Sequence, residues 1–132
     1  MQIAAVAVSA TDLSRAVAFY ELLGFRFPPL QGDTKHLESE AGVRLMIDEA
    51  AYLTSLHGEA PRPGNTAGFA ILFDAPEGVD AAAARVADAG QTVVTAPRST
   101  VIQPGPVHTG LTEDPDAEAD RLLCLLVLPV TD

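Results

Sequence analysis

The side chains that could do acid-base or metal chemistry at neutral pH are few and scattered. His36, His57 and His108 lie far apart, and no two of them share an H-x-H, H-x-x-x-H or H-E-x-x-H spacing. Such spacings place two imidazoles on one side of a strand or helix, as zinc sites require. The pattern therefore favours three separate imidazoles, at the surface or at a pocket edge. His108 is the strongest candidate for a ligand contact or a base.

Nucleophilic and phosphate chemistry have little support in the sequence. Cys124 is the single cysteine and lies in the apolar run 122–126, where a thiol acts as a small core residue. There is no G-x-S-x-G motif, and Gly32, Gly42, Gly58 and Gly64 lie in turns instead of between a strand and a helix. These patterns argue against a serine hydrolase of the common type and against a phosphate-binding loop.

Composition limits the remaining classes. With 132 residues, the chain suits one ordinary domain or two small modules that share a core. The net charge of -10, with Lys35 as the single lysine, argues against a nucleic-acid partner, because binding phosphates needs a basic surface. The apolar run 122–130 is too short to span a bilayer, and residues 1–8 lack the basic start of a signal peptide. With one cysteine and no disulfide framework, we expect a cytoplasmic protein.

The first half of the chain predicts a strand, a helix and three further strands. Residues 3–9 alternate as a strand, and Thr11 or Asp12 can cap a helix that Gly24 ends in the left-handed conformation. Leu13, Val17 and Tyr20 recur at helical spacing and predict one apolar face. The remaining predicted strands are 25–30, 34–40 and 43–48, the last two joined as a hairpin at Ala41-Gly42.

The second half predicts the same order of elements. Residues 49–66 are irregular, with a short helix possible over 50–56 and a linker composition at 61–65. A strand over 67–73 then leads to a helix over 78–89, whose stripe of Val79, Ala83 and Val86 is apolar and which Gly90 closes. Further strands are predicted over 91–96, 106–113 and 121–128. The repeat of strand, helix and three strands is a stronger signal of the fold than either half alone.

The segment from Ile3 to Phe25, with Thr11-Asp12-Leu13 and Leu22-Leu23-Gly24-Phe25, resembles the opening of the vicinal oxygen chelate superfamily. That superfamily includes glyoxalase I, extradiol dioxygenases and the bleomycin and mitomycin resistance proteins. The resemblance implies an α+β fold, in which two βαβββ modules form a curved mixed sheet that cups a ligand. It implies a single domain over 1–132, with module 1 at 1–48, a linker at 49–66 and module 2 at 67–132.

The resemblance also locates the positions that hold a metal in the superfamily's enzymes. These positions fall on Ala5, Asp48, a residue near Gly68 and a residue near Leu123. One carboxylate is not a metal site, and we interpret Asp48 as an exposed acid at a strand end. The resemblance therefore implies neither a metal nor another cofactor.

Segments 42–48 and 68–73 look most like the metal-free drug-binding members, which are paired or domain-swapped homodimers. The last third departs from the family pattern, because Gly105-Pro106-Val107-His108 replaces the usual Trp-Gly-Gln-Arg and the chain has no tryptophan. This departure leaves the identity of the ligand open.

Strand parity predicts which side chains line the cup. The predicted ligand contacts are Ala5, Ala7, Ser9, Arg44, Met46, Asp48, Ala70, Leu72 and His108, with Tyr52 and Leu56 as a lid. Ile3 and Gly68 fall on the same side. Small, mainly apolar walls suit a flat or bulky apolar ligand. Met46 could instead belong to the core, and Tyr52 and Leu56 could simply pack locally.

The sequence thus predicts a metal-independent homodimer that sequesters a hydrophobic or aromatic small molecule, such as an antibiotic or another natural product. The alternative is a small glyoxalase-type lyase or isomerase, or a dioxygenase-like enzyme, in which Asp48, Arg44 or His108 transfers a proton. A third hypothesis is that the protein is a degenerate paralogue, which serves only as a structural or regulatory partner.

Overall fold

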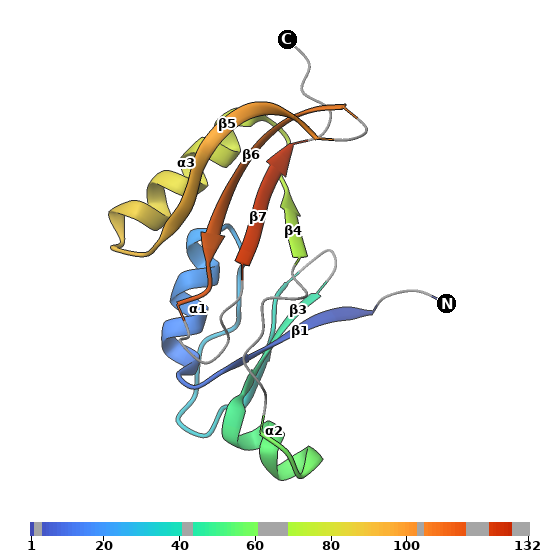
Figure 1. The fold of residues 1–132 in the computed structure, drawn as a ribbon. Coiled ribbons are helices and arrows are strands. Elements are labelled where there is room, and N and C mark those ends of the chain that lie inside the picture. Colours follow the sequence, from blue (N-terminus) through green and yellow to red (C-terminus); the bar gives the residue numbers. More distant parts are fainter. Residues whose placement is uncertain (2–3, 41–43, 61–68, 103–104, 116–121, 128–132) are drawn as a thin grey trace. The chain divides into compact units, whose positions relative to one another are not determined.

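The computed structural model describes residues 1, 4–40, 44–60, 69–102, 105–115 and 122–127 (Figure 1). The chain divides into two compact units, which we call unit 1 (Met1–Pro63 with Asp116–Ala119) and unit 2 (Gly64–Pro115 with Asp120–Asp132). The main boundary, after Pro63, falls within the predicted linker 49–66. That linker is not irregular throughout, because its first part is the helix that was considered possible.

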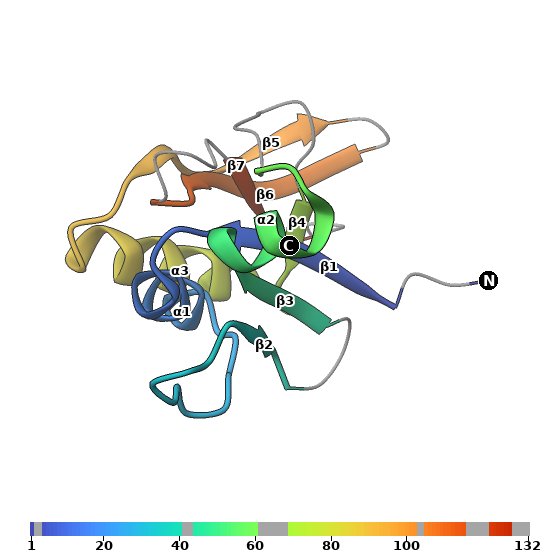
Figure 2. The ribbon, with the colours of Figure 1, turned by 90° about the horizontal axis from the view of Figure 1, so that it is seen from below.

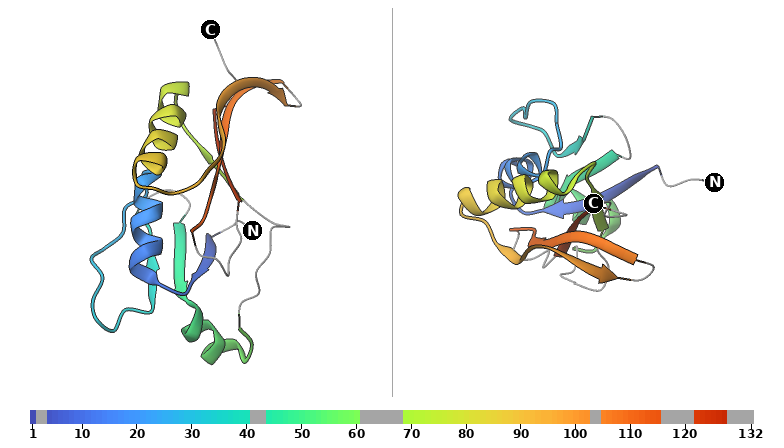
Figure 3. Two further views of the ribbon diagram at one scale, coloured as in Figure 1. Left: turned by 60° about the vertical axis from the view of Figure 1, so that its left-hand side comes forward. Right: turned by 90° about the horizontal axis from the view of Figure 1, so that it is seen from above.

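In its described residues, unit 1 contains a three-stranded sheet and two helices. Its elements are β1 (Ala5–Ala10), α1 (Leu13–Leu22), β2 (His36–Glu38), β3 (Arg44–Glu49) and α2 (Ala50–His57). The strand order is β1-β3-β2, with β1 parallel and β2 antiparallel to β3 (Figure 2). Helix α1 lies against one face of this sheet and contacts β3, while α2 follows β3 directly and contacts β3 and β1 (Figure 3).

Helix α1 forms where the sequence predicts it. The Asp12 side chain caps its start by accepting a hydrogen bond from the Arg15 backbone N–H at 3.1 Å. Gly24 follows its end with φ of 107°, which a residue without Cβ adopts at little cost. The predicted apolar face of Leu13, Val17 and Tyr20 is buried. This face makes up much of the core of unit 1 together with Val8, Leu45 and Ile47.

The predicted strand over 25–30 is wrong, because this segment forms no ladder with any described strand. Pro28 and Pro29 have no N–H to donate, so the segment could not sustain strand pairing. Its backbone hydrogen bonds include one from the Glu40 N–H to the Arg26 carbonyl at 2.9 Å and one from the Phe25 N–H to the Tyr20 carbonyl at 3.2 Å. The ring of Phe25 packs edge-on against Tyr20, which holds the start of the segment against α1.

Unit 2 has the full predicted order of strand, helix and three strands. Its elements are β4 (Phe69–Leu72), α3 (Pro76–Asp88), β5 (Val93–Ile102), β6 (Gly105–Glu113) and β7 (Leu122–Val127). The strand order is β4-β7-β6-β5, with β4 parallel to β7 and the other pairs antiparallel. Helix α3 covers one face of this sheet and buries the predicted stripe of Val79, Ala83 and Val86 together with Ala82 (Figure 3).

Helix α3 and strand β5 of unit 2 have other boundaries than predicted. Helix α3 begins at Pro76 instead of Gly78, because proline suits the first helical turn, where its missing N–H has no partner to lose. Strand β5 continues past Pro97 to Ile102, instead of ending at Ala96. The ladder with β6 shifts register between Thr95 and Arg98, and such an irregularity accommodates a proline within a strand.

The α+β fold with mixed sheets is confirmed in both units. In the parts of the chain that the structure describes, no helix is long and apolar enough to cross a membrane. Residues Ile3, Gly42 and Gly68, and the predicted linker at 61–65, lie outside the described residues.

Candidate functional site

The face of the unit 1 sheet opposite α1 gathers most of the predicted ligand contacts. In the parallel ladder Ala5 pairs with Arg44, Ala7 with Met46 and Ser9 with Asp48. Paired residues point to the same side of a sheet, and Val8, Leu45 and Ile47 are buried on the other side. The six predicted residues therefore share one face, which we call the polar face. It also includes two residues of β2 that were not predicted, His36 and Glu38.

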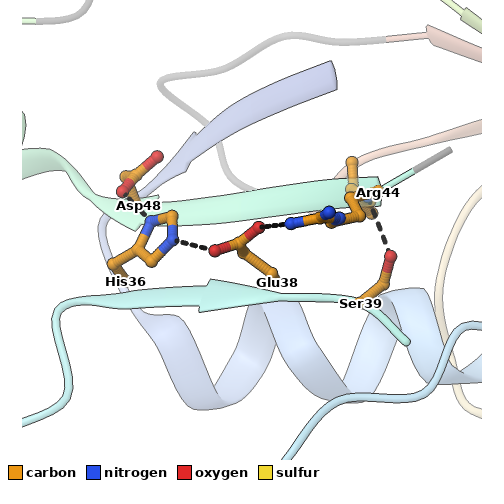
Figure 4. A network of polar contacts seen from close by, with 6 residues as sticks. His36, Glu38, Ser39, Arg44 and Asp48 are labelled. Atoms are coloured by element: carbon orange, nitrogen blue, oxygen red, sulfur yellow. Dashed lines mark hydrogen bonds and ion pairs between the residues drawn. The ribbon is translucent and has the colours of Figure 1, made fainter. Parts of the chain in front are cut away.

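Four side chains on the polar face form a continuous row of hydrogen bonds (Figure 4). His36 Nδ1 lies 2.6 Å from Asp48 Oδ1, and His36 Nε2 lies 3.1 Å from Glu38 Oε2. Arg44 Nη1 donates to the second Glu38 oxygen at 3.2 Å. The row runs along the β2–β3 hairpin from Asp48 at one end to Arg44 at the other, as Figure 4 shows.

The row follows from the register of the hairpin. His36 and Asp48 are cross-strand partners, and Glu38 is the partner of Met46. The Ser39 hydroxyl accepts a hydrogen bond from the Leu45 N–H at 2.8 Å, which fixes the other end of the pairing. Along the sequence, His36 and Asp48 are equidistant from Gly42, so the hairpin pattern contained a signal for this contact that the search for histidine pairs missed.

The interpretation of Asp48 as an exposed strand-end acid is wrong. Only 7 % of Asp48 is exposed, because it lies within β3, flanked by Ser9 on β1 and His36 on β2. A buried carboxylate needs hydrogen-bond donors, and His36 supplies one. Asp48 is therefore a buried, hydrogen-bonded residue on the central strand of the polar face.

The row favours a protonated imidazole. The hydrogen bond to Asp48, and secondly that to Glu38, raise the pKa of His36 above its ordinary value of 6.5. The hydrogen bond from His36, followed by that from Arg44, lowers the pKa of Glu38 below its ordinary value of 4.5. Because carboxylates only accept, both ring nitrogens donate when the imidazole is charged. Two carboxylates, one imidazolium and one guanidinium then balance in charge.

This geometry does not suit a metal ion. Asp48 and Glu38 contact opposite nitrogens of the same ring, so the two carboxylates do not converge on one point (Figure 4). Among the residues that the structure describes, no three His, Cys, Asp or Glu side chains are grouped so that they could hold a metal. What the row can do is orient a polar group of a bound molecule and hold a proton on His36, whose pKa it raises.

The predicted lid residues lie on α2. Tyr52 is half-buried, Leu56 is exposed, and the helix buries none of its residues fully. His57 is the last residue of α2 and is exposed. Helix α2 contacts β1 and β3, and the role of Tyr52 and Leu56 as a lid stays a prediction.

In unit 2, the predicted residues do not share one face. Leu72 pairs with Leu126, which pairs with Thr109, so Leu72 shares a face with Thr109, and His108 points to the other side. There His108 contacts Asp80 of α3. Ala70 and Leu72 are exposed, on the side of the sheet away from α3. Cys124 lies in β7 as predicted, and its side chain lies outside the described part.

Comparisons with known protein sequences give one family match. A family model described as "Protein of unknown function (DUF3037)" matches residues 69–127. No curated protein sequence matches the chain.

Solved structures match nearly the whole length of the chain. A glyoxalase-related enzyme from Fulvimarina pelagi is similar with a TM-score of 0.76 and 22% identity, covering 98% of this chain and 90% of that one. A hypothetical protein from S. aureus has a TM-score of 0.75 and 22% identity, with coverages of 96% and 94%. A glyoxalase/bleomycin resistance protein/dioxygenase family enzyme from Burkholderia phytofirmans PsJN has a TM-score of 0.74 and 17% identity, with coverages of 97% and 99%.

At these identities the matches establish fold alone. The chain has the fold of the glyoxalase/bleomycin resistance/dioxygenase proteins, as the resemblance of Ile3 to Phe25 implied. A fold hosts many activities, so function must be inferred from the polar face itself.

Proposed function

We propose that the chain is a metal-independent binding protein, which sequesters a hydrophobic or aromatic small molecule on the polar face. The observation that carries the proposal is the composition of this face. Its apolar part consists of Ala5, Ala7 and Met46, which leave space beside the sheet or adapt their shape. Its polar part is the row that ends at Asp48. Ligand sites commonly combine an apolar surface with a few convergent polar groups.

The residue types support a site that works without a metal. Ala5 has no donor atom where the superfamily's metal enzymes carry a ligand, and it lies beside Arg44, a cation. A guanidinium next to the site favours an anionic or acceptor group on the ligand over a metal cation. The guanidinium of Arg44 has five N–H donors and could donate to a carbonyl or a phenolate, while the flat apolar part of the ligand covers Ala7.

Binding would need a preformed surface and not a chemical step. Affinity then comes from apolar burial, with the polar row selecting orientation. In the proposal, a second copy of the chain completes the site, as in the homodimers of the metal-free members, and the protein acts in the cytoplasm. Tyr52 and Leu56 of α2 would cover the bound molecule.

A titration with matched variants tests the proposal. Isothermal titration of the full chain with a panel of polycyclic aromatic natural products should identify a ligand. The Ala7→Phe change fills the apolar part of the polar face, and we expect it to weaken binding by about tenfold or more, the loss of about 1.4 kcal/mol. Ala18→Phe is the same change on the exposed side of α1 and should leave affinity unchanged. Equal affinities of the two variants would overturn the proposed location.

The second candidate is a small lyase or isomerase that transfers protons without a metal. The contact between His36 and Asp48 favours it, because an imidazole paired with a carboxylate is a common general acid or base. In that case the ligand would return chemically altered, and His36→Gln would abolish turnover while binding persists. In the binding proposal the ligand returns intact from every variant.

A further inference from the structure

A second row of hydrogen bonds lies in unit 2, on the face of the sheet that α3 covers. The Ser99 hydroxyl of β5 lies 3.0 Å from Nδ1 of His108 on β6. Nε2 of the same ring lies 2.7 Å from Oδ1 of Asp80 on α3. A serine, a histidine and an aspartate thus form a continuous chain through the two nitrogens of one imidazole.

The order of the three groups fixes where the proton of a neutral ring resides. A carboxylate can only accept, so the contact with Asp80 requires the proton on Nε2. Nδ1 then carries the lone pair and faces the Ser99 hydroxyl, which donates to it. This is the arrangement in which an imidazole acts as a general base toward a hydroxyl group, while the carboxylate holds the tautomer and stabilises the charged ring that forms.

Two register shifts in the β5–β6 ladder bring Ser99 to this position. Val93 pairs with Thr112, and continuing that register would place Pro97 opposite His108. The shifts on either side of Thr95 place Ser99 there instead. Such irregularities redirect side chains and occur often beside active sites.

Gly110 allows the close approach of the two strands at the shift. A Cβ on Gly110 would lie 3.2 Å from the Thr95 carbonyl oxygen and 3.3 Å from Cγ of Pro97. The position of Ser99 opposite His108 thus depends on Gly110, which lies two residues further along β6 and has no side chain. The alignment has a specific structural cause, beyond the chance meeting of three polar surface groups.

The three groups differ in exposure in a way that suits a reaction at Ser99. Ser99 is exposed, and the side chain of Asp80 is 58% exposed, whereas that of His108 is only 12% exposed. The nucleophile is therefore accessible while the base is held in place. Among the strands that the structure describes, β5 also lies at the edge of its sheet, so backbone N–H groups on its outer side can donate to an oxyanion.

We propose that Ser99, His108 and Asp80 form an acyl-transfer site, which accepts the acyl group of small activated carboxylic esters. The Ser99 oxygen bonds to the ester carbonyl carbon while its proton passes to Nδ1 of His108. The tetrahedral intermediate collapses as the carbon–oxygen bond to the alcohol breaks, and His108 returns the proton to the departing alcohol. Water then repeats the sequence on the acyl-serine, which releases the acid and restores Ser99. Ser99 and His108 are the catalytic residues, and Asp80 is a positioning residue.

Acylation by p-nitrophenyl acetate and labelling by a fluorophosphonate probe test the site on the full chain. We expect one adduct per chain, located on Ser99 by peptide mass spectrometry, and none in Ser99→Ala. His108→Gln should slow acylation about 100-fold or more, the usual contribution of a general base. Ser55→Ala is the matched control, because Ser55 is an exposed serine whose hydroxyl donates to the Tyr52 carbonyl and not to an imidazole.

Asp80→Asn separates positioning from stability. It should slow acylation per folded molecule, measured after correction by urea denaturation, and Asp80→Glu should restore part of the rate. A purely structural role for Asp80 would change the denaturation midpoint and leave the corrected rate unchanged, which would overturn its assignment. An absence of adduct at Ser99 under conditions that fully label a known serine esterase would overturn the whole proposal, as would equal rates for His108→Gln and the unmodified chain.

Discussion

The contact between His36 and Asp48 should stabilise unit 1 in a way that depends on pH. A hydrogen bond to a charged group contributes about 1.5–3 kcal/mol when buried, and an exposed ion pair about 0.2–1 kcal/mol. The side chain of His36 is 38% exposed and that of Asp48 is 10% exposed, so this pair lies between the two cases. We therefore expect a coupling energy of about 1 kcal/mol when the imidazole is protonated.

The direction of the pH dependence follows from the pKa values. The pKa of His36 is raised above 6.5, so its stabilising effect is complete below that pH and is lost as the pH rises through the raised value. The pKa of Glu38 is lowered below 4.5, so its effect is present above that pH and is lost as the pH falls through the lowered value. The row should therefore be most stabilising between these two ordinary values.

A double-mutant cycle with urea denaturation measures the coupling. The unmodified chain, His36→Gln, Asp48→Asn and the double variant are compared at about pH 5.5, below the ordinary histidine pKa of 6.5, and at about pH 9, well above it. Lys35 and Glu49 form the matched control, because they pair at 3.6 Å across the same hairpin without an imidazole. Their coupling should be small at both pH values. A coupling between His36 and Asp48 that is equal or larger at the higher pH would refute the reasoning.

Two further predictions concern packing. Ile47→Ala should lower the free energy of unfolding by about 2–5 kcal/mol because Ile47 is 0% exposed, whereas Val94→Ala, at a site 47% exposed, should change it by about 0.5 kcal/mol or less; thermal denaturation of both variants checks this difference. Gly110→Ala should destabilise unit 2 by about 1–3 kcal/mol because its Cβ would press on the Thr95 carbonyl, while Gly32→Ala meets nothing within 4 Å and should be neutral; a destabilised Gly32→Ala with an unaffected Gly110→Ala would contradict the packing account.

Much of the fold could be predicted from local patterns. The cap at Asp12, the left-handed Gly24 and the stripe from Val79 to Val86 are properties of short segments, and the structure has all of them. The segment 25–30 was predicted wrongly because its aromatic residues have strand propensity, whereas Pro28 and Pro29 exclude ladder pairing.

The candidate sites were harder to predict because they depend on register. To predict that Ala7 and Met46 lie on one face, it is enough to know which residues alternate along each strand. The contact of His36 with Asp48 requires the exact pairing of a hairpin, and a slip of one residue would separate the two side chains. The contact of Ser99 with His108 depends on two register shifts, for which the sequence has no simple pattern.

Native mass spectrometry of the purified full chain, before and after incubation with divalent metals and polycyclic aromatic natural products, tests sequestration most directly. The proposed function predicts a dimer that retains an intact aromatic molecule without a metal, and a loss of that molecule in Ala7→Phe. A stoichiometric divalent metal that survives desalting, or a ligand recovered with a changed mass, would contradict it and favour an enzyme.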